Sequence, residues 1–183
     1  LGGGGSGGES DVVVVAAGAT LTATGIISFT ATSATENNST DAGNATLTAA
    51  SAGSTINVGS AGAGAFTLTG GDGVDIITGG GGADIITGGG AVDTIIGGAA
   101  IDTITGGAGN DIITGGAGND IITVDSGTDD IVDLGGSGGS ESDVLVIASG
   151  ATVTADNLAG FTATSATSNN STGAGNATLT AKA

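Results

Sequence analysis

The chain has 183 residues, of which 40 are glycine, and its 18 acidic residues against a single basic residue give a formal net charge of −17. It contains no histidine or cysteine, which excludes thiolate or imidazole zinc sites, Ser-His triads and cysteine nucleophiles. The chain lacks the basic patches that nucleic-acid binding requires, and it has no apolar run long enough to span a membrane.

Residues 1–69 read as a series of short strands. The opening LGGGGSGGES lacks the basic end and apolar stretch of a signal peptide. After it, threonine or alanine alternates with larger apolar residues, as in ATLTA at 45–49 and FTLTG at 66–70, and glycine or asparagine separates the runs. These strands are expected to continue one coil or to form a small sandwich beside it. The expected core comprises Val13, Val15, Leu21, Phe29, Leu47, Ile56, Phe66 and Leu68.

From Gly70 the sequence repeats every nine residues, and residues 70–132 are assigned to this block. Six units read GGDGVDIIT, GGGGADIIT, GGGAVDTII, GGAAIDTIT, GGAGNDIIT and GGAGNDIIT, and a seventh reads VDSGTDDIV. The sixth position is always aspartate, at Asp75, Asp84, Asp93, Asp102, Asp111, Asp120 and Asp129. The eighth is always isoleucine, at Ile77, Ile86, Ile95, Ile104, Ile113, Ile122 and Ile131. A fixed short period predicts a repeat architecture.

Each unit predicts a glycine-rich turn followed by a short strand whose central isoleucine points inward. Two units would complete one coil, so turns 18 residues apart would stack. One edge would then carry Asp75, Asp93, Asp111 and Asp129, and the other Asp84, Asp102 and Asp120. Carboxylates stacked about 4.8 Å apart repel one another unless a cation lies between them. Calcium suits this position because it accepts six to eight oxygen ligands in loose geometry.

The units resemble the RTX (repeats-in-toxin) calcium-binding nonapeptide, G-G-x-G-x-D-x-U-x. The resemblance implies an all-β fold, a parallel β-roll or β-solenoid in which aspartates and loop carbonyls of two stacked turns hold each Ca²⁺. It implies bridges 75–93, 93–111 and 111–129 on one edge, and 84–102 and 102–120 on the other. Besides the seven aspartates, the implied metal-site residues are Gly70, Asp72, Gly79, Gly81, Gly88, Gly90, Gly97, Ala99, Gly106, Ala108, Gly109, Gly115, Ala117, Gly118 and Gly127.

Alternatives to a calcium array are weaker. An unmetallated coil with aspartates capping their own turns gives no reason for a strict partner 18 residues away, and a phosphate-binding loop would be repelled by the carboxylates. Ala91 and Ala100 replace glycine where a positive φ is costly, which predicts weaker turns there. The remaining acids of this region, Asp72, Asp125, Asp130 and Asp133, would complete end sites or stay solvated. The block is expected to fold when calcium binds.

The two ends of the chain are near-copies. Residues 9–50 and 141–182 are identical at 30 of 42 positions, offset by 132 residues, so a longer tandem repeat surrounds the nonapeptides. Residues 133–183 are therefore assigned to a second, partial strand-rich segment. Within the copies, DVVVV and DVLVI resemble degenerate calcium-loop strands, beginning at Asp11 and Asp143.

Three surface patterns remain open. Ile76, Ile85, Ile112 and Ile121 should point outward and form apolar stripes, which usually meet a partner. Thr-x-Thr steps such as Thr46/Thr48 and Thr67/Thr69 are typical of flat ice-binding faces, although threonine is also an ordinary strand residue. Sequons occur at Asn37, Asn38, Asn44, Asn169, Asn170 and Asn176, and such triplets also arise by chance in Asn/Thr-rich chains.

These features predict a structural protein without enzymatic activity. The leading hypothesis is a calcium-stiffened β-solenoid segment of a secreted bacterial filament, S-layer or adhesin, which is extracellular and self-associates. The first alternative is a carrier module attached to a secreted enzyme, as RTX segments are in some proteases and lipases. The second is an ice- or carbohydrate-binding adhesin module, which would require a flat ligand-facing array.

Overall fold

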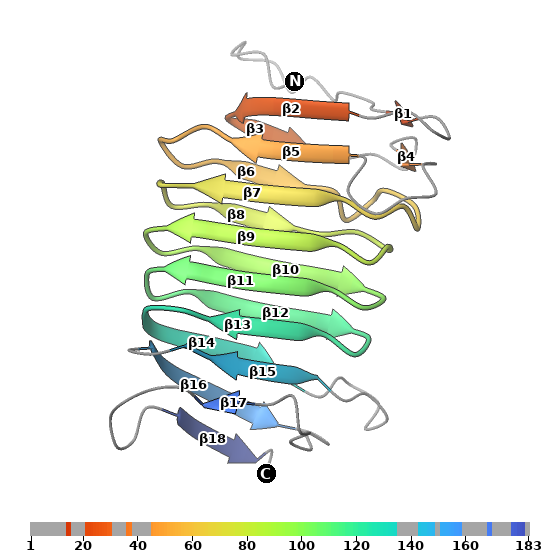
Figure 1. Cartoon of the computed structure of the whole chain (residues 1–183). Coiled ribbons are helices and arrows are strands. Elements are labelled where there is room, and N and C mark those ends of the chain that lie inside the picture. The colour runs from red at the N-terminus through yellow and green to blue at the C-terminus, as the bar shows by residue number, and fades with distance from the viewer. Residues whose placement is uncertain are drawn as a thin grey trace.

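A computed structural model describes residues 14–15, 21–30, 36–37, 45–134, 143–148, 151–158, 168–169 and 177–181. In these ranges all regular secondary structure is β-strand, and the strands wind into one stack of coils (Figure 1). The all-β parallel solenoid expected from the sequence is confirmed. The described residues include no helix that could cross a membrane.

Two eight-stranded parallel sheets form the walls of the stack. The front sheet, which faces the viewer in Figure 1, runs β2 (Leu21–Ile26), β5 (Ala45–Ala49), β7 (Thr67–Gly71), β9 (Ile85–Gly90), β11 (Thr103–Ala108), β13 (Ile121–Val124), β15 (Val144–Ile147) and β17 (Ser168–Asn169). The back sheet runs β3 (Ser28–Thr30), β6 (Thr55–Asn57), β8 (Ile76–Thr78), β10 (Thr94–Ala99), β12 (Ile112–Ala117), β14 (Gly127–Asp133), β16 (Ala151–Leu158) and β18 (Ala177–Ala181). Two short strands, β1 (Val14–Val15) and β4 (Glu36–Asn37), pair with each other to one side.

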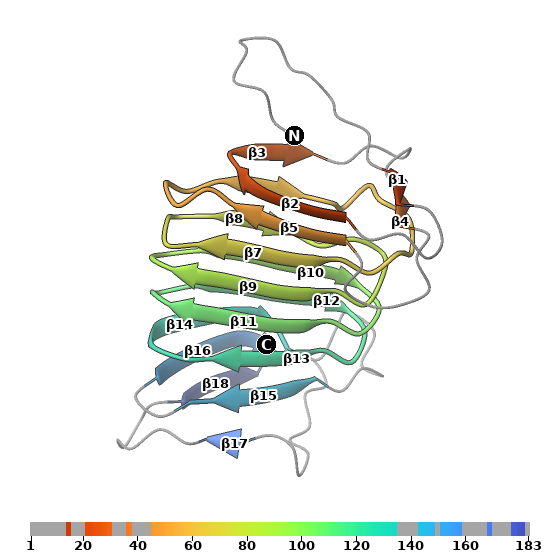
Figure 2. The ribbon, with the colours of Figure 1, turned by 45° about the horizontal axis from the view of Figure 1, so that its top comes forward.

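The chain alternates between the sheets from β5 to β18, so each coil contributes one strand to each wall (Figure 2). In the nonapeptide block the register is 18 residues, as in Ile77↔Ile95 and Ile86↔Ile104. Outside it the coils lengthen: Leu47 pairs with Leu68, and Ile122 pairs with Leu145. The flanking strands therefore continue the same coil, which decides between the two arrangements left open by the sequence.

The core is a single row of side chains between the walls. All seven isoleucines at the eighth position are at most 1% exposed, and Phe29, Leu47, Ile56, Phe66 and Leu68 are buried with them, as expected. Each contributes roughly 1.5–3 kcal/mol on burial. Leu21 is only partly buried, Val15 lies in β1 without a described side chain, and Val13 lies outside the described residues. The seventh-position isoleucines point outward, with Ile76 50% exposed, as expected.

The strands of the block are longer than the expected three residues. Strands β9 to β12 each span six residues because they continue through the two glycines of the next unit. The main chain of these glycines stays in register with the coil below, as in Gly89↔Gly107. A glycine pair therefore serves as the end of a strand as well as the beginning of a turn.

Candidate metal centre

The seven nonapeptide aspartates lie where the turns lead into the strands, and all are buried to within 1% of full exclusion from solvent. The register brings together Asp75, Asp93, Asp111 and Asp129 along one edge, here called the first ladder. The second ladder, along the other edge, comprises Asp84, Asp102, Asp120 and Asp143. The predicted stacking of turns 18 residues apart is confirmed.

One carboxylate oxygen of each aspartate joins neighbouring turns. The main-chain N–H of Asp93 donates to Oδ1 of Asp111 at 2.9 Å, and the N–H of Asp111 donates to Oδ1 of Asp129 at 2.9 Å. The corresponding bonds of the second ladder measure 2.8 Å at each step from Asp84 to Asp143. Hydrogen bonds to a charged acceptor are stronger than neutral ones, so each bond ties one coil to the next.

The other oxygen, Oδ2, is buried in the turn. In Asp93, Asp102, Asp111 and Asp129 it has no hydrogen-bond partner among the described residues. Burial raises the pKa of Asp93 and Asp129 to about 6 and that of Asp102 to about 7; N–H donors oppose the shift, and neighbouring carboxylates add to it. A buried, unpaired anionic oxygen is costly. These oxygens are therefore the observation that fits a bound cation.

The first glycine of each unit makes room for this carboxylate. A Cβ built on Gly97 would lie 2.6 Å from Oδ2 of Asp102, and one on Gly106 would lie 2.7 Å from Oδ2 of Asp111. A Cβ on Gly97 would also overlap the carbonyl oxygen of Gly115 in the next coil. Main-chain carbonyls and carboxylates are thus packed together at closer range than any side chain allows. The predicted first-position residues Gly70, Gly79, Gly88, Gly97, Gly106 and Gly115 all lie beside their own aspartate or, at Gly115, beside Asp120.

Two turns carry alanine in the left-handed region. Ala91 has φ 67° and Ala100 has φ 74°, in agreement with the strain expected at these positions. Directly above them, a Cβ on Gly109 or Gly118 would overlap the carbonyl oxygen of Ala91 or Ala100. The fourth positions of successive turns therefore stack closely, and glycine is required in the later coils.

The third-position residues and the outlying acids are placed less uniformly. The predicted Gly81 and Gly90 are partly exposed, whereas Ala99, Ala108 and Ala117 are exposed. Asp72 and Asp130 are exposed, and Asp133 is partly exposed. Asp125 differs, because its Oδ1 is buried without a partner, burial raises its pKa, and its charge raises the pKa of Asp111 and Asp129. Asp125 therefore joins the first ladder as a further acid.

Three ladder positions do not follow the nonapeptide pattern. Asp143 extends the second ladder after a gap of 23 residues, and the DVLVI motif was the signal that could have placed it there. Phe66 occupies the aspartate position of the coil before Asp84, whose Oδ1 accepts the Phe66 N–H at 2.7 Å. Ser54 occupies the position before Asp75, where its carbonyl accepts the N–H of Ile76 at 2.9 Å. Asp11 lies outside the described residues.

No group of three or more acidic side chains converges within the described ranges. A cation between two turns must therefore take part of its ligands from main-chain carbonyls. Calcium accepts mixed carboxylate and carbonyl oxygens in flexible geometry, and it would neutralise the unpaired Oδ2 atoms. The donor set, all oxygen with no nitrogen or sulfur, fits this ion.

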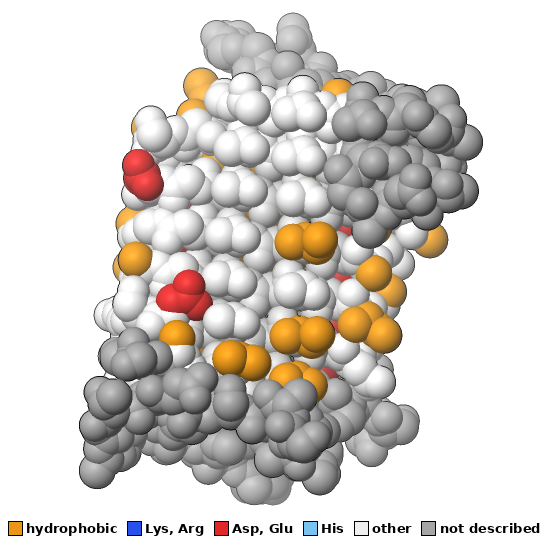
Figure 3. Space-filling view, viewed as in Figure 1, with side chains coloured by type: hydrophobic (Ala, Val, Ile, Leu, Met, Phe, Trp, Pro, Cys, Tyr) orange, Lys and Arg blue, Asp and Glu red, His pale blue; other side chains and the backbone are white. Residues whose placement is uncertain are grey.

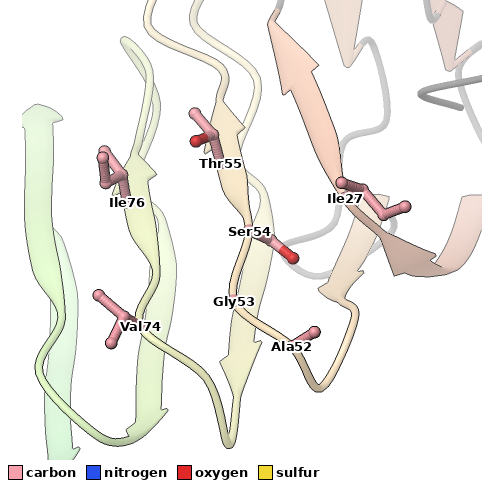
Figure 4. Close-up of a pocket in the computed structure, with 7 residues that line it drawn as sticks. All are labelled: Ile27, Ala52, Gly53, Ser54, Thr55, Val74 and Ile76. Atoms are coloured by element: carbon pink, nitrogen blue, oxygen red, sulfur yellow. The ribbon is translucent and has the colours of Figure 1, made fainter. Parts of the chain in front are cut away.

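An open hollow of about 290 Å³ lies near the start of the block (Figure 4). It is lined by Ile27, Ala52, Gly53, Ser54, Thr55, Val74 and Ile76. Its walls contain no acid, and the Ser54 hydroxyl donates to the carbonyl of Ile26 at 2.6 Å. The hollow is a gap at a corner of the coil, separate from the ladders.

Comparison with known families agrees with this geometry. The family model described as RTX calcium-binding nonapeptide repeat (4 copies) matches residues 60–95, 69–104 and 96–131. The match begins at residue 60 and thus includes the coil in which Phe66 replaces aspartate. No curated protein and no solved structure matches the chain. The nonapeptide units of this chain therefore belong to the RTX calcium-binding repeats, and they form a calcium-binding β-roll.

Proposed function

We propose that the chain is a structural segment of an extracellular bacterial filament, surface layer or adhesin, stiffened by calcium and without enzymatic activity. The observation that supports this most is continuity. Both carboxylate ladders run through consecutive coils, and the strands of the flanking segments extend the same two sheets. The acids form a repeated array, whereas acid–base catalysis uses two carboxyl groups held in unequal environments.

The proposed ligands are the aspartates of adjacent turns together with turn carbonyls. On the first ladder, the pairs are 75–93, 93–111 and 111–129; on the second, they are 84–102 and 102–120, with 120–143 added by the structure. Bound calcium supplies positive charge between stacked carboxylates. The chain contributes the rest: Oδ1 holds the next coil by its N–H, and Oδ2 faces the turn interior.

Calcium dependence supports an extracellular setting. Extracellular calcium modules bind with dissociation constants of about 10⁻⁴–10⁻³ M. A site with a dissociation constant of about 0.1 mM in about 10 mM calcium stabilises the folded state by roughly 2.7 kcal/mol. Several such sites would decide whether a coil with only one row of core side chains is folded.

Self-association is supported by exposed apolar side chains and by the tandem repeat. On the back sheet, Ile76, Ile96 and Ile112 are 50%, 38% and 42% exposed and lie on successive strands. Open ends of a solenoid also expose strand edges, which favour addition of more strands. Such head-to-tail contacts need not close, so they produce fibres or layers.

Electron microscopy of the purified chain, first in calcium and then in chelator, tests this proposal. Fibres or layers are expected in calcium, and they should dissolve when calcium is removed because the coils lose their bridges. Monodisperse particles in calcium would contradict the filament and favour the second candidate, a calcium-dependent carrier module of a secreted enzyme.

A further inference from the structure

The outer surface of the front sheet carries two straight columns of side chains. It is called here the threonine face and comprises Thr46, Thr48, Thr67, Thr69, Ile85, Thr87, Thr103, Thr105, Ile121 and Thr123, two from each of five successive strands. These positions alternate with fully buried core residues, so their side chains point outward. Figure 3 shows them as paired rows of uncharged groups over the front sheet.

The columns are regular in both directions. Pairing is in register at every step from β5 to β13, so rungs repeat at about 4.8 Å, and the two columns lie about 6.6 Å apart, two strand residues. One column consists of threonine on all five rungs: Thr48, Thr69, Thr87, Thr105 and Thr123. Threonine is β-branched and restricted at χ1. The hydroxyl and methyl groups therefore repeat with little freedom to adapt.

The charge of the chain restricts what this face can bind. The chain has a net charge of −17, yet no residue of the threonine face is charged. Ionic partners therefore find nothing to pair with here, and a second copy of the chain would approach against like charge. Phe29 and Phe66 are buried, and the face has no aromatic side chain on which a sugar ring could stack.

The back sheet lacks this arrangement. Its corresponding column reads Asn57, Thr78, Ile96, Thr114 and Asp133 on successive strands, so threonine alternates with amide, apolar and acidic groups. The regular array therefore does not follow from the coil itself, which builds both sheets with the same geometry. It is a property of the front sheet only.

We propose that the threonine face binds ice. Because every rung repeats the one before it, a ligand that matches one rung must itself repeat at the same spacing to match the others. Because the face is flat, uncharged and rigid, that ligand must be a flat, neutral lattice of hydrogen-bonding groups. Water ordered on the hydroxyls and around the methyl groups joins such a lattice without rearrangement of the protein.

The test uses the whole chain in calcium and a matched pair of variants. Thr105→Tyr alters the threonine face on β11, whereas Thr114→Tyr alters the same position of the repeat on β12 of the back sheet. The two strands have the same pattern of burial, and tyrosine is favourable in strands. Circular dichroism confirms that each variant is folded before thermal hysteresis and ice-crystal shape are measured.

The native chain and Thr114→Tyr are expected to shape ice crystals and to lower the freezing point below the melting point. Thr105→Tyr should lose most of this effect, because the bulky ring interrupts the array. A folded native chain without thermal hysteresis would overturn the proposal, as would equal loss in both variants. Binding to crystalline chitin, or a dimer disrupted by Thr105→Tyr, without any effect on ice would assign the face to those partners instead.

Discussion

Each ladder aspartate divides its two oxygens between two tasks. Oδ1 of Asp111 accepts the N–H of Asp93, which any amide oxygen could also do, whereas Oδ2 is buried without a hydrogen-bond partner. The first oxygen serves the fold and the second serves the cation. Replacing aspartate by asparagine separates these tasks, because it keeps the acceptor and removes the charge.

Asp111→Asn should therefore weaken calcium binding much more than Asp72→Asn. Asp111 lies between Asp93 and Asp129 and would contribute to two sites, whereas Asp72 is exposed. Altering the surroundings of a metal ligand typically costs 10–100-fold in affinity, so a loss of at least about tenfold is expected at Asp111. Calcium titration by calorimetry gives the comparison. Equal effects would contradict the stacking of these turns.

Ala91→Gly should stabilise the calcium-bound chain. Alanine at φ 67° has a left-handed backbone, which costs roughly 1–2 kcal/mol and which glycine adopts freely. Glycine loses about 0.4–1 kcal/mol through its more flexible unfolded state, so a net gain of up to roughly 1 kcal/mol is expected. The matched control is Ala99→Gly in β10, where φ is not positive and only the loss applies. Urea unfolding in calcium measures both; a stabilised control or a destabilised Ala91→Gly would disagree.

At the scale of the elements, period and position predicted what side chains dictate but missed what the main chain dictates. The aspartate and isoleucine positions follow from side-chain periodicity, and both ladders agree with it. The six-residue strands could not be predicted, because glycine carries no side-chain signal of its pairing. Phe66 and Ser54 take aspartate positions through register alone, and the longer coil before Asp143 hides it from an 18-residue search.

The ladders predict opposite effects of acid with and without calcium. In the folded chain, the pKa is about 6 for Asp93 and Asp129 and about 7 for Asp102, above the ordinary 3.8. A raised pKa gives stability that is complete below about pH 4 and is lost as the pH rises through 6 to 7. In chelator, the chain should therefore be more folded at pH 4.5 than at pH 8. Calcium, which requires the charged carboxylates, should bind more weakly as the pH falls.

Circular dichroism against pH, in calcium and in chelator, measures both trends. Acidification also reduces the overall charge, so the control is Asp72→Asn, which removes one exposed charge and leaves the ladders intact. Asp102→Asn should flatten the profile in chelator more than this control does. Greater unfolding of the chelated native chain in acid would show that protonation does not relieve the buried carboxylates.

At the scale of the whole molecule, the fold is a balance between one row of core side chains and 17 net negative charges. A compact chain of this length has a radius of gyration of about 16 Å, somewhat more if elongated, and an unfolded one about 45 Å. Small-angle X-ray scattering should show the compact value in calcium and a marked expansion in chelator. Sodium chloride screens exposed charges but does not fill the turns, so high salt should not restore compaction. An unchanged radius in chelator would mean that core packing suffices.

The two near-copies of the flanking sequence lie on opposite walls. Strand β5 of the first copy is in the front sheet, whereas β18, with the same ATLTA sequence, is in the back sheet, thirteen strands later. Their neighbours repeat the same register: Leu21↔Ala45 corresponds to Val153↔Ala177. The number 132 alone did not reveal this, because the coils differ in length.

An odd number of strands per unit makes successive units of a tandem array related by a two-fold screw axis, with a rise of about 31 Å for six and a half coils. A feature confined to one wall of a unit then emerges on the opposite side in the next. The threonine face would alternate in this way along the fibre. Such a fibre has no front or back of its own and could attach to a surface on either side with equal strength.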